Sequence, residues 1–151
     1  MAGAVLVLSS CGNHSTLYNF TRHGVVDLRG AVTLQGRFST TEFWGADPHA
    51  CAASVHASRY PNFGYGSKIA IDGQSFSLDL YPKRGVGTSV GNAVIGVGND
   101  FYVDPSSTIT LRADGGGSVS VQDALNVGAT TGGPALTGTV RWSCRDEAAG
   151  P

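Results

Sequence analysis

The segment KIAIDGQSFSLDLY, residues 68–81, indicates the fold of the chain most clearly. Ile69 and Ile71 alternate with other residues before the turn, and apolar and polar residues alternate again on the run that follows. The Asp72-Gly73 pair between the two runs supplies the positive φ values of a tight turn. These residues are therefore predicted to form a β-hairpin.

The same pattern continues along the chain on both sides of this hairpin. No window of useful length shows the i, i+3, i+4 apolar spacing of an amphipathic helix. Alternating runs separated by turn residues instead predict further strands over 31–38, 93–97, 101–103, 108–112, 118–121 and 136–144. The sequence thus predicts an all-β fold, an antiparallel β-sandwich or small barrel of about eight strands with Gly-rich turns.

Length and charge narrow the possible functions. The 151 residues fit a single domain, and no apolar run approaches the roughly 20 residues of a membrane-spanning helix. Ten Lys and Arg residues stand against 11 Asp and Glu, with no basic run in the sequence. Nucleic acid is therefore not expected as a partner, because its binding depends on concentrated positive charge.

The N-terminal residues resemble a bacterial lipoprotein signal. An apolar run over 2–8 is followed by Ser9, Ser10 and Cys11, like a lipobox in which small residues precede the cysteine that is acylated. We expect residues 1–10 to be the remnant of a signal peptide and Cys11 to carry the lipid. No Lys or Arg occurs before position 22, so the usual basic start of such a signal is missing. The alternative is that residues 5–8 form a strand and Cys11 is an ordinary thiol.

Two further cysteines remain once Cys11 is set aside. Cys51 and Cys144 make an even pair, and an exported β-rich domain is where a structural disulfide is expected. The alternative is a metal site at His49, Cys51 and His56, which lie within eight residues. That cluster lacks the paired Cys-x-x-Cys spacing of structural zinc, and no metal or other cofactor is predicted.

These features divide the chain into four parts. Residues 1–10 are interpreted as the signal-peptide remnant, 11–23 as a tether, 24–144 as the β-domain and 145–151 as a disordered tail. Within the domain, the small and polar stretch 123–134 is expected to be a surface loop. The Gly-rich stretch 85–91 is expected to be a flexible hairpin connection, because it lacks the Lys-Ser/Thr pair of a phosphate-binding loop.

The layout as a whole resembles that of a known group. A lipobox cysteine, a short polar tether, a Gly/Thr/Val-rich β-domain and a closing strand TVRWSC over 139–144 are similar to small cell-envelope lipoproteins of actinobacteria, including the mycobacterial lipoprotein antigens. The resemblance implies acylation at Cys11 and a disulfide between Cys51 and Cys144. It also implies an exported protein at the outer face of the cell membrane or in the cell wall, and it implies no catalytic activity.

The strongest candidate for ligand binding is the segment RYPNFGYG over 59–66. Its Pro and Gly residues disfavour a regular central strand, so we expect some of its rings to face outward on a loop. Exposed rings beside amide and guanidinium groups suit a glycan or protein partner. The alternative is that these rings plug one end of the fold. The predicted patch consists of Trp44, Arg59, Tyr60, Asn62, Phe63 and Tyr65.

The sequence offers few candidates for catalytic residues. The acidic residues are mostly Asp at turns, where they bond to nearby backbone groups. His49 and His56, with Glu42, are the best candidates for a hydrolase site, although no Gly-x-Ser-x-Gly motif accompanies them.

The sequence therefore favours a lipid-anchored, non-catalytic β-domain that binds a partner or has a structural role in the bacterial cell envelope. A small secreted hydrolase, or an accessory subunit of a larger surface assembly that adds to a neighbour's sheet edge, are the alternatives.

Overall fold

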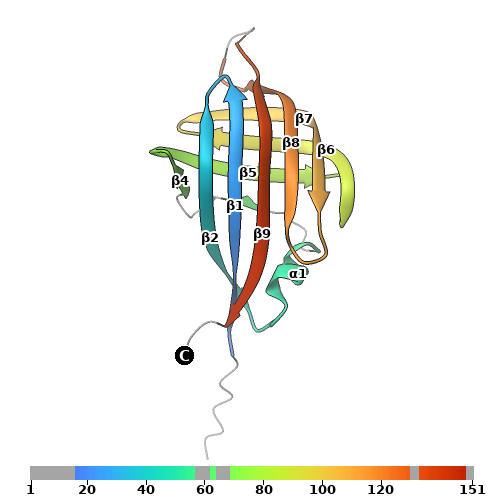
Figure 1. Cartoon of the computed structure of the whole chain (residues 1–151). Helices are drawn as coiled ribbons and strands as arrows, with labels where there is room; N and C mark the ends of the chain where they lie inside the picture. Colours follow the sequence, from blue (N-terminus) through green and yellow to red (C-terminus); the bar gives the residue numbers. More distant parts are fainter. Residues whose placement is uncertain (1–15, 57–61, 64–68, 130–132, 149–151) are drawn as a thin grey trace, which may run out of the picture.

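The computed structural model describes residues 16–56, 62–63, 69–129 and 133–148 (Figure 1). Most of these residues lie in strands, and the helix α1 has five residues. The prediction of an all-β fold is confirmed. In chain order the elements are β1 (Tyr18–Gly30), β2 (Leu34–Gly45), α1 (Ala50–Ser54), β3 (Asn62–Phe63), β4 (Ile69–Ile71), β5 (Gln74–Pro82), β6 (Gly87–Val97), β7 (Asp100–Leu111), β8 (Gly117–Asn126) and β9 (Leu136–Ala148).

The strands form one antiparallel sheet that curls into a nearly closed barrel. Its order is β2-β1-β9-β8-β7-β6-β5-β3, and β4 pairs with β5. The last strand lies beside the first, from Tyr18 opposite Ala148 to Gly30 opposite Leu136. In Figure 1, β5, β6 and β7 cross behind β1, β2 and β9. Of the two predicted architectures, the single curled sheet agrees with the barrel.

Side chains rather than backbone hydrogen bonds close the gap between the two sheet edges. Phe38 on β2 meets Phe76 on β5 with ring centroids 5.7 Å apart. The inward side chains of all the long strands fill the barrel with one apolar cluster, whose burial is the main favourable term in folding. Its fully buried members include Val26, Leu28, Leu34, Leu78, Ile95, Ile109, Leu111, Val119, Leu136 and Val140.

The predicted hairpins are present. Ile69 pairs with Phe76 across the Asp72-Gly73 turn, whose φ values are 50° and 75°. The predicted strands over 93–97 and 101–103 lie in β6 and β7, and those over 108–112 and 118–121 meet in the pairing of β7 with β8.

The predicted tether and tail need correction. Residues 18–23 are the start of β1 and not a tether, and residues 145–148 are the end of β9 and not a tail. Each of these extensions hydrogen-bonds to the other, because β1 and β9 pair along their whole length. The start of β1 lacks clean alternation, since Thr21 and Arg22 are both buried, and this hid the strand in the sequence.

Three further boundaries differ from expectation. The stretch 87–91 is not a connection but the first half of β6, paired with residues 107–111 of β7. Residues 123–126, expected in a loop, belong to β8. Residues 31–33, expected in a strand, form the turn before β2.

One glycine is required by the tight packing of β1 against β9. Gly138 has φ +135°, and a Cβ there would collide with the backbone oxygen of Asp27. We expect Gly138→Ala to lower the free energy of unfolding by about 2 kcal/mol in urea denaturation. Gly45→Ala is the control, because Gly45 also has positive φ but an added Cβ meets nothing within 4 Å. An equal loss in both variants would mean that backbone conformation alone, and not the collision, sets the cost.

Among the described residues, no helix has the length and apolar character needed to cross a membrane.

Candidate functional site

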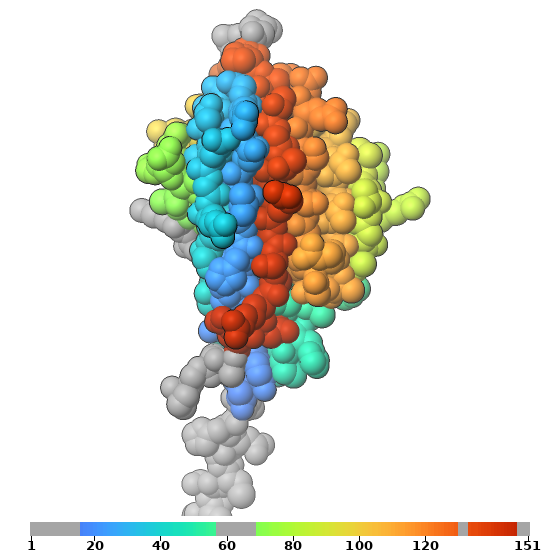
Figure 2. Space-filling model, in the orientation of Figure 1, coloured from blue at the N-terminus to red at the C-terminus, as the bar shows by residue number. Residues whose placement is uncertain are grey.

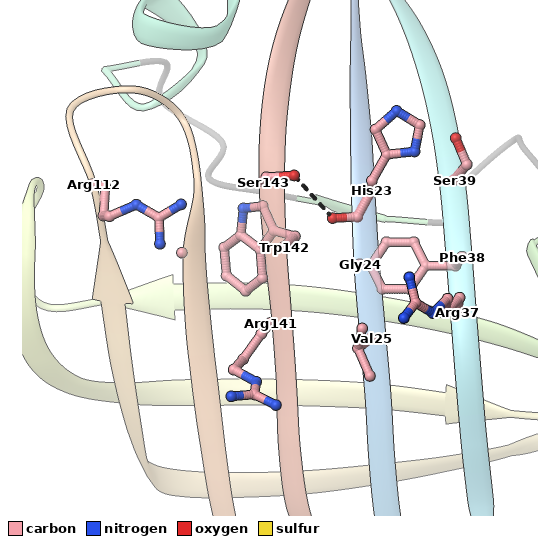
Figure 3. Close-up of a pocket in the computed structure, with 11 residues that line it drawn as sticks. His23, Gly24, Val25, Arg37, Phe38, Ser39, Arg112, Arg141, Trp142 and Ser143 are labelled. Atoms are coloured by element: carbon pink, nitrogen blue, oxygen red, sulfur yellow. Dashed lines mark hydrogen bonds between the residues drawn. The ribbon is translucent and has the colours of Figure 1, made fainter.

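The strands β2, β1 and β9 lie side by side on the face of the barrel that is turned toward the viewer in Figure 2. A hollow lies on the outer surface of these strands (Figure 3). Its volume is about 620 Å³. We name it the arginine hollow. The residues that line it are His23, Gly24, Val25, Arg37, Phe38, Ser39, Arg112, Gly117, Arg141, Trp142 and Ser143.

The strand register determines how the outward side chains surround the hollow. His23 on β1 lies opposite Ser39 on one side and Ser143 on the other. Two residues further along β1, Val25 lies between Arg37 of β2 and Arg141 of β9 in the same way. All of these side chains are exposed. Two rows of three outward side chains therefore cross the outer face of β2, β1 and β9. One row carries two hydroxyl groups and an imidazole, and the other carries two guanidinium groups with Val25 between them.

The residues between these rows point into the barrel and support the hollow from below. Phe38 and Trp142 flank Gly24, and a Cβ at position 24 would collide with the Phe38 ring. The Trp142 Nε1 donates a hydrogen bond to the backbone oxygen of Gly115 at 3.2 Å. The alternation of buried and exposed residues thus holds the strands close together while it directs the polar side chains outward.

The turn between β7 and β8 contributes the third guanidinium. The backbone N–H of Arg112 donates to Gly116 O at 2.8 Å, and the Arg112 Nε lies 3.3 Å from Asp114 Oδ1. The same carboxylate oxygen accepts the Gly116 N–H at 2.9 Å. This backbone bond is the main reason why the pKa of Asp114 lies below its ordinary value, and Arg112 adds to the effect.

The charged residues that line the hollow are arginines. Its lining includes three arginines and no Asp or Glu. Within the described part of the chain, the ion pairs within 4 Å involve Arg22, Arg29 and Arg112, so Arg37 and Arg141 are in none of them. Sequence reasoning missed this site because residues 37, 112 and 141 are far apart in the chain, and β1, which brings two of them together, was not predicted.

A second feature lies where α1 packs against the end of the barrel. Cys51 and Cys144 form a disulfide with Cα atoms 5.8 Å apart, which confirms the pair predicted from the sequence. The Cys51 N–H donates to Asp146 Oδ1 at 2.6 Å, so the helix is attached to β9 twice. Cys51 is therefore not a metal ligand, and the described residues contain no group of His, Cys, Asp and Glu side chains placed to hold a metal ion.

An ion pair between a buried arginine and a half-buried glutamate lies beside the disulfide. Arg22 on β1 is 3% exposed and donates to Glu42 Oε1 on β2 at 2.7 Å. Its guanidinium also lies 4.5 Å from the centre of the Phe20 ring and donates to Ser54 Oγ on α1 at 3.4 Å. Burial lowers the pKa of Arg22 and raises that of Glu42, and in both cases the attraction between the two opposes the shift.

Of the predicted aromatic patch, Trp44 is the member whose side chain the structure describes. Trp44 is half-buried and packs edge-on against Phe20, with centroids 5.7 Å apart, beside the disulfide. The backbone of Asn62 and Phe63 forms the short strand β3 against β5, where a loop was expected. The remaining members of the patch, Arg59, Tyr60 and Tyr65, lie outside the described residues, as does Cys11.

The predicted hydrolase residues have other roles or stand apart. Glu42 is paired with Arg22, and His49 precedes the first residue of α1, with its backbone N–H bonded to Asp47 Oδ1 at 2.8 Å. His56 is exposed just after the helix. Across the described ranges, no side-chain hydrogen bond joins either histidine to Glu42.

Comparison of the chain with protein-family models, with curated proteins and with solved structures finds no match.

Proposed function

We propose that the chain is an exported β-barrel domain, held at the outer face of a bacterial membrane by acyl chains on Cys11, and that it is a non-catalytic binding or structural component of the cell envelope. The observation that carries this proposal is the Cys51–Cys144 disulfide. Disulfides persist in oxidising compartments outside the cytoplasm. Because two of the three cysteines are paired with each other, Cys11 is the one left for modification.

The place where β1 begins is compatible with such an anchor. Tyr18 starts the strand, and the seven residue steps from Cys11 to Tyr18 span at most about 25 Å. The start of β1 and the helix α1 lie at the same end of the barrel (Figure 1). An acylated Cys11 would therefore keep this end close to the membrane and leave the side of the barrel, with the arginine hollow, open to a ligand.

Acylation is tested by expressing the natural gene in a bacterium that processes lipoproteins and supplying an alkyne-labelled fatty acid. We expect the label on the chain, a mature N-terminus at Cys11 and recovery in the membrane fraction, because two or more acyl chains anchor a protein firmly. Cys11→Ser should abolish all three while the Cys51–Cys144 disulfide remains. Ser9→Ala keeps a small residue before the cysteine and should leave the label unchanged. A mature protein that retains residues 1–10 and carries no label would contradict the proposal.

A further inference from the structure

We propose that the arginine hollow binds a phosphate group, carried either by a small soluble molecule or by a lipid headgroup. This inference goes beyond the anchoring proposed above and does not depend on it, because it concerns the side of the folded barrel and not Cys11. It rests on the register of three strands, on the charge of the lining and on the size of the hollow.

The register places two guanidinium groups on either side of one short side chain. Arg37 and Arg141 are each paired with Val25, so their backbones are two interstrand spacings, or about 9.5 Å, apart. Val25 is 39% exposed and too short to fill the space between them. In Figure 3 the Arg37 side chain extends toward β1, whereas the Arg141 side chain extends away from it. Both are long and exposed, so a turn of the Arg141 side chain would let the two guanidinium groups converge on one group above Val25.

The third guanidinium comes from a different part of the chain. Arg112 reaches the hollow from the β7–β8 turn, next to Gly117, on the far side of β9 from Arg37. Its carboxylate neighbour Asp114 lies in the turn and is not part of the lining. A ligand that contacts Arg141 and Arg112 together would bridge β9 and the turn, so the hollow offers positive charge on two sides of its centre.

The chemistry of these groups favours phosphate. A guanidinium presents a planar fork of N–H donors that matches the oxygens of phosphate, and charge-assisted bonds of this kind are about twice as strong as neutral ones. The lining contains no carboxylate, but two lie next to it. Asp114 pairs with Arg112 at 3.3 Å. The pKa of Asp27 on β1 is lowered mainly by the hydrogen bond from Gln35, and the charges of Arg29 and Arg141 add to the effect. A phosphate would therefore compete with these two carboxylates for Arg112 and Arg141. The Ser39 and Ser143 hydroxyls and the His23 imidazole in the adjacent row provide neutral donors. Three guanidinium groups suit a doubly charged phosphate better than a single carboxylate.

The dimensions fit a ligand of moderate size. A volume of about 620 Å³ lies in the middle of the range of small-molecule sites, which is roughly 300–1,000 Å³. This volume exceeds that of a phosphate group, so a part of the molecule that carries the phosphate would also fit. The Ser143 hydroxyl makes only a long bond of 3.5 Å to the His23 backbone oxygen, so it can turn toward such a ligand.

The test uses the whole chain as Cys11→Ser, with the disulfide intact, and inorganic pyrophosphate as the probe in isothermal titration calorimetry at low salt. We expect saturable binding that weakens as salt is added. Loss of a charge-assisted contact commonly costs about tenfold in affinity, so the double variant Arg37→Gln/Arg141→Gln should weaken binding by about 100-fold. Arg29→Gln removes the same charge from an exposed position of β1 outside the hollow and should change affinity less than twofold.

A second arm separates the two sources of phosphate. Flotation of the same protein with phosphatidylcholine vesicles that contain phosphatidic acid reports binding to a headgroup. Pyrophosphate binding that the double variant loses supports a soluble phosphate ligand. Vesicle binding that the double variant loses, without pyrophosphate binding, supports a headgroup.

Three outcomes would overturn the proposal. These are no binding in either arm, an equal loss in Arg29→Gln, and citrate binding as tightly as pyrophosphate. Thermal unfolding of each variant confirms that the barrel is intact, as expected for substitutions at exposed positions.

Discussion

The double variant Cys51→Ala/Cys144→Ala is expected to lose about 2–5 kcal/mol of unfolding free energy, measured by urea denaturation without reductant. The disulfide closes a loop of sequence separation 93. The chain-entropy estimate for a loop of that length is about 4–5 kcal/mol, which is an upper figure. Because native domains have about 5–15 kcal/mol in total, the loss would be a large share of the stability of the barrel.

The Cys11→Ser variant is the matched control, because it removes a cysteine that lies outside this pair. It should unfold at the same urea concentration as the natural chain. Reduction of the natural chain with dithiothreitol should reproduce the stability of the double variant. An unchanged midpoint in both the double variant and the reduced chain would show that the hydrogen bond from Cys51 to Asp146 and the packing of α1 hold this end of the barrel without the covalent link.

Most of the sheet could be predicted from the sequence because its strands obey simple alternation. The hairpin around Asp72-Gly73 is the clearest case, since Ile69, Ile71 and Phe76 all point inward. Alternation fails where polar side chains are buried by a specific partner. Arg22 is buried because Glu42 lies beside it on the next strand, and such a tertiary pair cannot be read from local periodicity.

The arginine hollow escaped prediction for a related reason. Arg37 and Arg141 lie on strands that the sequence does predict, at positions that alternation directs outward. What brings them together is β1, which pairs with both strands and places Val25 between them. The disulfide needed no such knowledge of strand order, since the cysteine count alone suggested its pairing.

Of the variants at the α1 end that leave the disulfide intact, removal of Glu42 is expected to be the most damaging. Arg22 is 3% exposed, whereas the Glu42 side chain is 36% exposed. A guanidinium does not lose its proton in proteins, so Glu42→Leu removes the carboxylate that accepts from Arg22 at 2.7 Å while the charge stays buried. We expect a loss of about 3 kcal/mol, at the lower end of the range for broken buried ion pairs.

Replacement of Arg22, the other member of the pair, should lower the free energy of unfolding by less. In Arg22→Met, the carboxylate of Glu42 is left unpaired but partly reaches water, and we expect a loss of about 1 kcal/mol at pH 7, discounted for that exposure. The double variant Arg22→Met/Glu42→Leu should recover most of the stability, because an apolar pair avoids the desolvation of both charges. A double-mutant cycle in urea measures these differences. Arg112→Met is the control, because it breaks the exposed ion pair with Asp114, in which the Arg112 side chain is 53% exposed, and it should change the unfolding midpoint little.

The pH dependence of the stability of Arg22→Met shows whether its loss comes from the unpaired charge of Glu42 or from poorer packing. Burial raises the pKa of Glu42 above its ordinary value of 4.5, and Arg22 opposes the shift, so removing Arg22 raises that pKa further. A carboxyl group whose pKa is higher in the folded than in the unfolded chain binds more protons when folded. Its stabilising protonation is fully present below pH 4.5 and is lost as the pH rises through the folded value. Arg22→Met should therefore be closest to the natural chain near pH 4 and fall behind it toward pH 7. A deficit that stays constant over this range would mean that the methionine packs poorly against Phe20, and that the charge of Glu42 has no part in the loss.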